Sequence, residues 1–280
     1  MANELLDAIS QGNAISRPLI WLDAEEYGSR VVLNGKPFPW NNPTEFVSGY
    51  GQVQSLLKAN VAPIHLGRFL HSWLAANSPA LTEMSGKKRV RFAIKRLLGM
   101  EGQRQVIREI VSALCESRSE PVVLVLPPNG ELINWANSKA NGAEPVNLTD
   151  IDIDSVSVYL ADFMRSFSGL NIAGVLVELP HGEEVNPDLL ELYSPIINVA
   201  KHYHWALGMA VSGAGVQDPE EKLQFVVSDQ AAETITGLIQ NDAFWRGEPC
   251  NWKAPHFVYA TVPPDMTPEL VLDRLAEMHG

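Results

Sequence analysis

Cysteine and positive charge are scarce in this chain. Its 280 residues include two cysteines, Cys115 and Cys250, which are too few and too distant for a disulfide framework. We therefore expect a reducing, cytoplasmic location. The formal net charge is -12 at pH 7, and the basic run Lys87-Lys88-Arg89 is short. This balance argues against a nucleic-acid partner, because proteins that bind nucleic acids present a basic face.

Long apolar runs and familiar catalytic motifs are also missing. No segment reaches the roughly 18 consecutive apolar residues of a membrane helix, so we expect no membrane partner. The first residues carry Glu4 and Asp7 and lack the layout of a signal peptide. The chain contains no C-x-x-C, H-E-x-x-H, P-loop or G-x-S-x-G motif. Residues 212–215 read S-G-A-G, without the G-x-G-x-x-G fingerprint that would support nucleotide binding.

What the sequence does contain is a series of short apolar runs, each followed by polar or ionisable residues. The runs are residues 18–22, 63–64, 121–126, 172–177, 205–211, 225–227 and 257–260. Continuous apolar runs are typical of parallel strands covered on both faces, and helical patterns separate several of them. The pattern predicts one α/β domain over residues 1–280, a (β/α)8 TIM barrel, for which about 250 residues is typical. The eighth strand lies around residues 234–239 or is degenerate.

Two additions to the barrel are expected. Residues 1–16 predict a helical N-terminal extension, and residues 28–51 are rich in glycine, proline and asparagine. A loop of that length is often functional, so residues 28–51 predict a lid, with Tyr27 and Trp40 able to close over a flat substrate. The alternative is a surface segment that its aromatic residues pin down.

The residues that follow the strands of such a barrel build its active site. We expect Glu178, Asp23 and His65 to be catalytic, since carboxylates and imidazoles at a barrel mouth take shifted pKa values readily. Glu178 is the first choice, because a carboxylate directly after an apolar strand costs stability unless it is paired or functional. The alternative roles are a partner for Arg68 and a histidine that is simply hydrogen-bonded in place.

The remaining candidates are expected to bind substrate. Arg68 can hold a carboxylate in a two-pronged hydrogen-bonded fork. The other candidates are Tyr27, Trp40, Asn129, His181, Ser212 and Asp229. Two have plain structural alternatives: Asn129-Gly130 is a turn dipeptide, and Asp229 is a helix cap if residues 230–238 form a helix.

Three segments carry a resemblance to a known superfamily. Residues 18–27 are similar to a P-V-W-x-M-R-Q-A-G-R-Y opening, residues 122–135 to a strand ending in G-P-x-T-L, and residues 262–270 to a closing P-x-x-T-P-x-E-N. This arrangement resembles the uroporphyrinogen decarboxylase and cobalamin-independent methionine synthase barrels, which implies a barrel enzyme acting on small molecules. Asp23 and Glu26 replace arginines of the decarboxylase opening, and residues 210–212 lack the His-x-Cys zinc ligands of the methyltransferases. The resemblance therefore carries over no catalytic residue.

From these observations we expect a lyase that uses no cofactor and cleaves a C–C bond, by decarboxylation or retro-aldol chemistry, in a small carboxylated compound, with an aromatic compound as one option. One alternative is a metal-dependent hydrolase or lyase that holds a divalent metal such as zinc with Asp23, His65 and Glu178. Others are a methyltransferase of the methionine synthase group and a non-catalytic barrel subunit. The sequence leaves homo-oligomerisation open.

Overall fold

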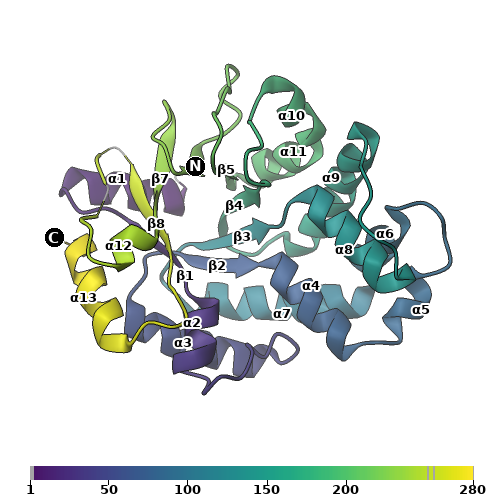
Figure 1. The fold of residues 1–280 in the computed structure, drawn as a ribbon, viewed down its shortest axis with the longest axis horizontal. Helices are drawn as coiled ribbons and strands as arrows, with labels where there is room; N and C mark the ends of the chain where they lie inside the picture. Colours follow the sequence, from purple (N-terminus) through teal and green to yellow (C-terminus); the bar gives the residue numbers. More distant parts are fainter. Residues whose placement is uncertain (1–2, 251, 255, 280) are drawn as a thin grey trace.

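The computed structural model describes residues 3–250, 252–254 and 256–279. Eight parallel strands form one sheet that curls into a nearly closed barrel, in the order β1-β8-β7-β6-β5-β4-β3-β2 (Figure 1). The strands are β1 (Ile20–Asp23), β2 (Ala62–His65), β3 (Val122–Leu126), β4 (Ile172–Glu178), β5 (Ala206–Val211), β6 (Phe225–Ser228), β7 (Ile235–Gln240) and β8 (Phe257–Thr261). The predicted (β/α)8 TIM barrel is confirmed. Strand β7 is the eighth strand, so a helix over residues 230–238 was wrong.

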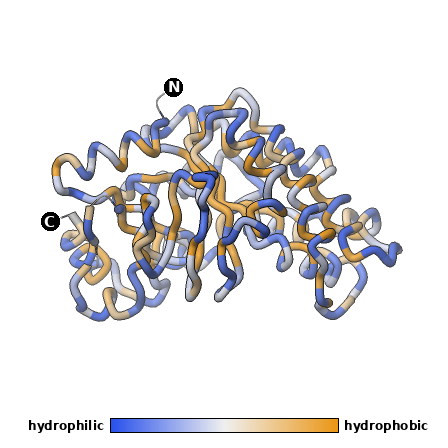
Figure 2. The backbone as a smooth tube through the Cα atoms, turned by 90° about the horizontal axis from the view of Figure 1, so that it is seen from above, coloured by the Kyte–Doolittle hydropathy of each residue, from blue (hydrophilic) through white to orange (hydrophobic). Residues whose placement is uncertain are grey.

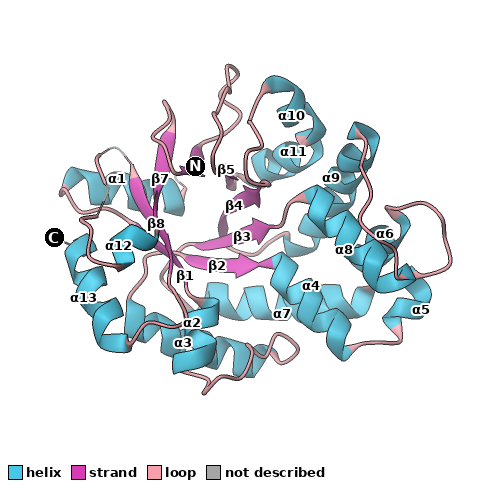
Figure 3. Cartoon of the chain, in the orientation of Figure 1, coloured by secondary structure: helices cyan, strands magenta, loops and turns pink. Residues whose placement is uncertain are grey.

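The helices are distributed unevenly around this barrel (Figure 3). They are α1 (Glu4–Ala14), α2 (Glu25–Val31), α3 (Pro43–Leu57), α4 (Leu66–Ala76), α5 (Ala80–Met84), α6 (Phe92–Leu98), α7 (Glu101–Ser117), α8 (Asn129–Asn141), α9 (Asp150–Met164), the short 3-10 helix η1 (Arg165–Phe167), α10 (Pro187–Leu192), α11 (Ser194–Tyr203), α12 (Asp242–Trp245) and α13 (Pro268–His279). Residues 212–224 and 229–234, which join β5 to β6 and β6 to β7, contain no helix. None of the helices in the described part of the chain has the length and apolar character needed to cross a bilayer.

The barrel is not closed by hydrogen bonds between β1 and β2. Within the described residues these two strands are the ends of the sheet, and Pro63 explains why. The Ala62 N–H donates to the carbonyl oxygen of Pro121, which directly precedes β3. Successive backbone N–H groups of a strand point to opposite sides, so Pro63 is the residue whose N–H would point toward β1. Proline has no N–H to donate. Asn60 joins the two strands instead. Its side-chain Oδ1 accepts from the Ile20 backbone N–H at 2.8 Å, and its backbone N–H donates to Ile20 O at 2.7 Å.

The barrel interior is filled by large side chains from alternate strand positions. Trp21 stacks on Phe257 with ring centroids 6.2 Å apart and also contacts Phe225. Gly208 and Gly237 make room for these rings, because a Cβ at either position would collide with Phe225 or Phe257. The apolar segments accordingly gather along the central strands in Figure 2.

Helix α1 covers the amino-terminal end of the barrel. Leu5 and Ile9 are buried in the same cluster as the interior strand residues. The Asn3 side chain fixes the helix by donating to Ala173 O at 2.8 Å and to His204 O at 3.0 Å. The structure thus contains the helical extension expected at residues 1–16, of which residues 1–2 lie outside the described part.

The long loop predicted at residues 28–51 was wrong. Helix α2 continues to Val31 and α3 begins at Pro43, so only residues 32–42 connect them. Asn42 is the N-cap of α3, since its side chain accepts from the Glu45 amide at 3.3 Å, and Pro43 occupies the first turn. Asparagine followed by proline is a helix-start signal as well as a loop signal, which is why composition alone misled the prediction.

Candidate active site

Three ionisable side chains from three strand ends meet at the mouth of the barrel. Asp23, His65 and Glu178 are the last residues of β1, β2 and β4. His65 Nε2 lies 3.6 Å from Asp23 Oδ1, and His65 Nδ1 lies 3.9 Å from Glu178 Oε1. The imidazole therefore stands between the two carboxyl groups. The structure brings together all three residues that the sequence singled out as catalytic.

Arg68 completes this group from the first turn of α4, which begins directly after β2. Its Nη1 and Nη2 donate to the two oxygens of Asp23 at 2.7 and 2.6 Å, and Nη1 also donates to Glu25 Oε2 at 3.3 Å. These bonds use three of the five N–H groups of a guanidinium. The remaining two, on the Nε edge, make no hydrogen bond to the described residues. Arg68 is therefore anchored by Asp23 and still able to hold an anionic group.

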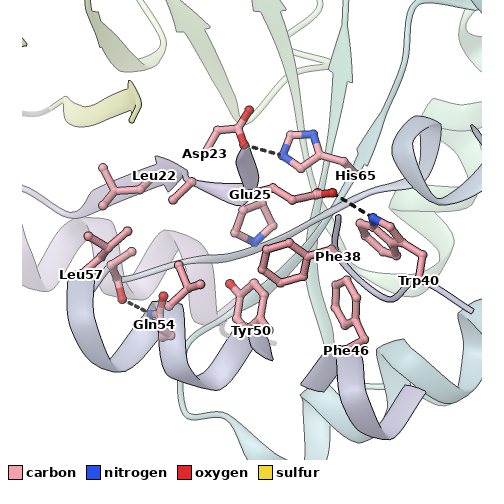
Figure 4. A pocket seen from close by; sticks show the side chains of 14 residues that line it. Leu22, Asp23, Glu25, Phe38, Trp40, Phe46, Tyr50, Gln54, Leu57 and His65 are labelled. Carbon is pink, nitrogen blue, oxygen red and sulfur yellow. Dashed lines mark hydrogen bonds and ion pairs between the residues drawn. The ribbon is translucent and has the colours of Figure 1, made fainter. Parts of the chain in front are cut away.

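Trp40 and Tyr27 do not form a lid. Trp40 is 3% exposed, and its indole Nε1 donates to Glu25 Oε1 at 2.9 Å (Figure 4). It therefore positions Glu25 beneath the mouth. Tyr27 is fully buried in the layer between the barrel and its helices, where it cannot cover a substrate ring. Burial, followed by the charge of Glu269, raises the pKa of Tyr27.

The electrostatics of the mouth give each group a different protonation state. Burial lowers the pKa of His65 to about 4, so the imidazole is neutral at neutral pH. Burial opposes ionisation of Asp23, yet His65 and the Arg68 guanidinium outweigh it and hold the Asp23 pKa below its usual value. With His65 neutral, Arg68 is the group that keeps Asp23 ionised at neutral pH. Burial, and then the charge of Asp23, raises the pKa of Glu178 to about 7.

Tyr259 is a mouth residue that the sequence analysis missed. It lies on the inner side of β8, two residues after the interior Phe257, and packs on Trp21 at 5.9 Å. Burial and the charges of Asp23 and Glu178 raise its pKa well above the usual range, so its hydroxyl stays protonated and can donate a hydrogen bond. Counting alternate positions along β8 from Phe257 would have identified it.

An open cavity of about 260 Å³ lies beside this group, between α4 and α8. Its polar end is formed by His65, Arg68, Glu178 and Glu131. The opposite wall is flat and aromatic, because His71 and Trp135 stack with ring centroids 4.1 Å apart at 24°. We refer to it as the mouth cavity. Its shape suits a small flat molecule with an anionic substituent.

The other predicted binding residues lie elsewhere. His181 and Ser212 pair at 3.1 Å between Nδ1 and Oγ, and Asp229 Oδ1 accepts from the Gly213 amide at 3.4 Å. These three form a separate, largely exposed group after β4, β5 and β6.

Asn129 is fully buried between α8 and α9, where its Nδ2 donates to Ile153 O at 3.2 Å and to Ser157 Oγ at 2.9 Å. Both donors of its amide are thus used inside the protein. The prediction that Asn129 binds substrate is therefore wrong: the residue is fully buried, and its amide joins two helices.

The alternative metal site at Asp23, His65 and Glu178 competes with the Arg68 guanidinium. Among the described residues, no group of three or more His, Cys, Asp or Glu side chains is arranged to hold a metal ion. In the set Asp23, His65 and Glu178, both oxygens of Asp23 are already bound by Arg68. A cation at Asp23 would have to displace this guanidinium or lie beside it.

The raised pKa of Glu178 leads to a prediction about stability. A carboxyl whose pKa is raised from 4.5 to about 7 by folding contributes stability that is complete below pH 4.5 and is lost as the pH rises through 7. Glutamine does not ionise, so Glu178→Gln should not lose stability in this pH range. Because the Glu178 side chain is 36% exposed, we discount for solvent screening and expect a gain on the order of 1 kcal/mol at pH 8 and none at pH 4. Denaturant unfolding of both proteins at the two pH values measures it, and an equal effect at both would contradict the raised pKa.

Comparisons of this chain with protein-family models, with curated proteins and with solved structures find no match. The site must therefore be interpreted from its own geometry.

Proposed function

We propose that this protein is a C–C lyase that acts on a small carboxylated compound by proton transfer at the barrel mouth. The observation that carries the proposal is Glu178, a carboxyl with a pKa of about 7 at the edge of the mouth cavity. A general acid works best when its pKa lies near the working pH. Catalytic groups of (β/α)8 barrels also lie at this end of the strands.

The residues divide the work as follows. The Nε edge of Arg68 binds a carboxylate of the substrate, and the Trp135–His71 wall supports its flat part. When the C–C bond breaks, its electron pair stays on the substrate carbon as a carbanion or enolate. The other fragment leaves as CO2 in a decarboxylation, or as a carbonyl compound whose hydroxyl proton passes to solvent in a retro-aldol cleavage. Protonated Glu178 donates a proton to that carbon and forms the new C–H bond, and the resulting carboxylate takes a proton from solvent. Both decarboxylation and retro-aldol cleavage need this protonation step.

Neutral His65 and protonated Tyr259 supply hydrogen bonds to the developing charge. His65 is 6% exposed and lies between the Asp23 and Glu178 carboxyl groups. Hydrogen-bond donors placed where charge develops typically lower a barrier strongly in a site shielded from water. Asp23 keeps Arg68 in place and remains ionised throughout.

A screen of small aromatic and aliphatic carboxylates and β-hydroxy acids in D2O tests this function. The expected result, measured by NMR, is a cleaved product with one deuterium on the carbon that kept the electron pair of the broken C–C bond. The control is the same screen with Glu178→Gln. Cleavage that proceeds equally in the variant, or product without deuterium at that carbon, would contradict the proposal.

A further inference from the structure

A second, smaller cavity opens from the mouth toward the seam between β1 and β2. We refer to it as the seam cavity; its volume is about 40 Å³. Leu22 of β1 and Pro63 of β2 contribute to its wall, and α3 closes its outer side. It lies where β1 and β2 are joined by Asn60 and not by a ladder of hydrogen bonds.

The lining of the seam cavity is mainly apolar, with Tyr50 and Gln54 as the polar residues of α3 among it. Phe38, Phe46, Val53 and Leu57 surround it, and Asp23, Glu25 and His65 stand at its opening (Figure 4). At its far end the Gln54 amide is held by Ala59 O and by Glu120 Oε1 at 3.0 Å. The cavity is therefore a short pocket with a mainly apolar wall and ionisable groups at its opening.

His65 connects the seam cavity to the mouth cavity, because it lines both. Its Nε2 is buried and has no hydrogen-bond partner within the described residues. An orphaned polar atom of this kind costs stability unless a ligand or water satisfies it. A group that enters the seam cavity from the mouth passes this nitrogen.

We propose that the seam cavity is a specificity subsite for a short unbranched alkyl group of the substrate, with a polar atom at the base of that group bonded to His65 Nε2. A water-sized atom needs about 10–15 Å³ of such volume, so 40 Å³ holds about three non-hydrogen atoms, the length of a propyl group. This inference rests on the proposed function, since it assigns the substrate of the same site.

Xenon binding tests the subsite without any substrate. Crystals of the full chain under xenon pressure should show an atom between Phe46, Val53 and Leu57, as apolar cavities bind this gas. Val53 already packs against Gly28, so the extra methyl of Val53→Ile must enter the cavity and should abolish binding. Leu57→Ala enlarges the cavity and should retain xenon. Val199→Ile, in α11 and outside the cavity, is the matched control and should bind as wild type. Absence of xenon from both wild type and Leu57→Ala would overturn the proposal.

Chain length in the reaction tests the assignment to substrate. For a compound cleaved in the screen, kcat/KM should rise about tenfold with each carbon from the methyl to the ethyl to the propyl homologue. The butyl homologue should have a lower kcat/KM than the propyl homologue. Val53→Ile should move the optimum one carbon shorter, while Val199→Ile leaves it unchanged. Xenon in the cavity together with no dependence of wild-type kcat/KM on chain length would refute the subsite and leave the lyase function standing. A screen without any cleaved compound would refute the lyase function, and with it the alkyl subsite, while the xenon result would still show whether the cavity takes apolar atoms.

Discussion

Glu178→Gln lowers kcat by about 10²–10⁴-fold, the usual contribution of a positioned proton donor. Glutamine keeps the shape and polarity of the side chain but has no proton to give. For the wild-type protein, kcat/KM should fall as the pH rises through about 7, because the donor is the protonated form of a group with that pKa. Steady-state kinetics from pH 5 to 9 on a substrate from the screen measure both effects.

The matched control is Glu131→Gln, which changes a second carboxyl that lines the same cavity. Among the described residues, no hydrogen bond joins Glu131 to Glu178 or His65, and Glu131 acts on Glu178 through its charge. We therefore expect a change of less than about tenfold, within the size of a lost peripheral interaction. An unchanged rate in Glu178→Gln, or a kcat/KM that rises through pH 7, would remove Glu178 from the role of proton donor.

Arg68→Met destabilises the protein by about 2–4 kcal/mol, because the ionised Asp23 loses its partner in a site from which water is largely excluded. The Asp23 side chain is 10% exposed and that of Arg68 is 33% exposed, so we place the effect below that of a fully buried pair. The pKa of Asp23 is lowered by folding. The stability that this pair contributes is therefore present above the usual pKa of 3.8 and is lost as the pH falls below it. The difference between wild type and variant should shrink in acid.

Two further variants separate this explanation from a general packing defect. In the double variant Asp23→Asn/Arg68→Met the buried charge is gone, so most of the stability should return. Arg96→Met breaks the exposed pair with Glu83, whose two side chains are 50% and 58% exposed, and should cost less than about 1 kcal/mol. Urea unfolding gives all four values. Equal losses in the single and double variants would contradict the explanation by an unpaired Asp23 charge.

Much of the architecture could be predicted because it depends on local patterns. An apolar run such as residues 121–126 is interpretable as a buried parallel strand without knowledge of its neighbours. In parallel strands the carboxyl ends lie at the same edge of the sheet, so the sequence places Asp23, His65 and Glu178 at the same end of the barrel. Asp23 and Glu178 each come within 4 Å of His65 because the three side chains point inward from their strand ends.

The remaining features depend on contacts that the sequence pattern does not contain. Asn129, which follows β3, joins two helices, and Trp40, in the segment between α2 and α3, donates to Glu25. The open seam depends on one missing N–H at Pro63, which matters only because β1 is the strand beside it. Tyr259 was overlooked because it lies within an apolar run, where the alternation of strand faces has to be counted residue by residue.

The central claim is that Glu178 titrates near neutral pH and that its protonated form gives the proton to the substrate carbon. Its most direct test is a carbon-13 NMR titration of the glutamate side-chain carboxyls, in which the Glu178 signal is identified by its loss in Glu178→Gln. The account predicts a midpoint near pH 7. A midpoint near the ordinary value of about 4.3 would mean that Glu178 is ionised at neutral pH, and that it is not the proton donor of this site.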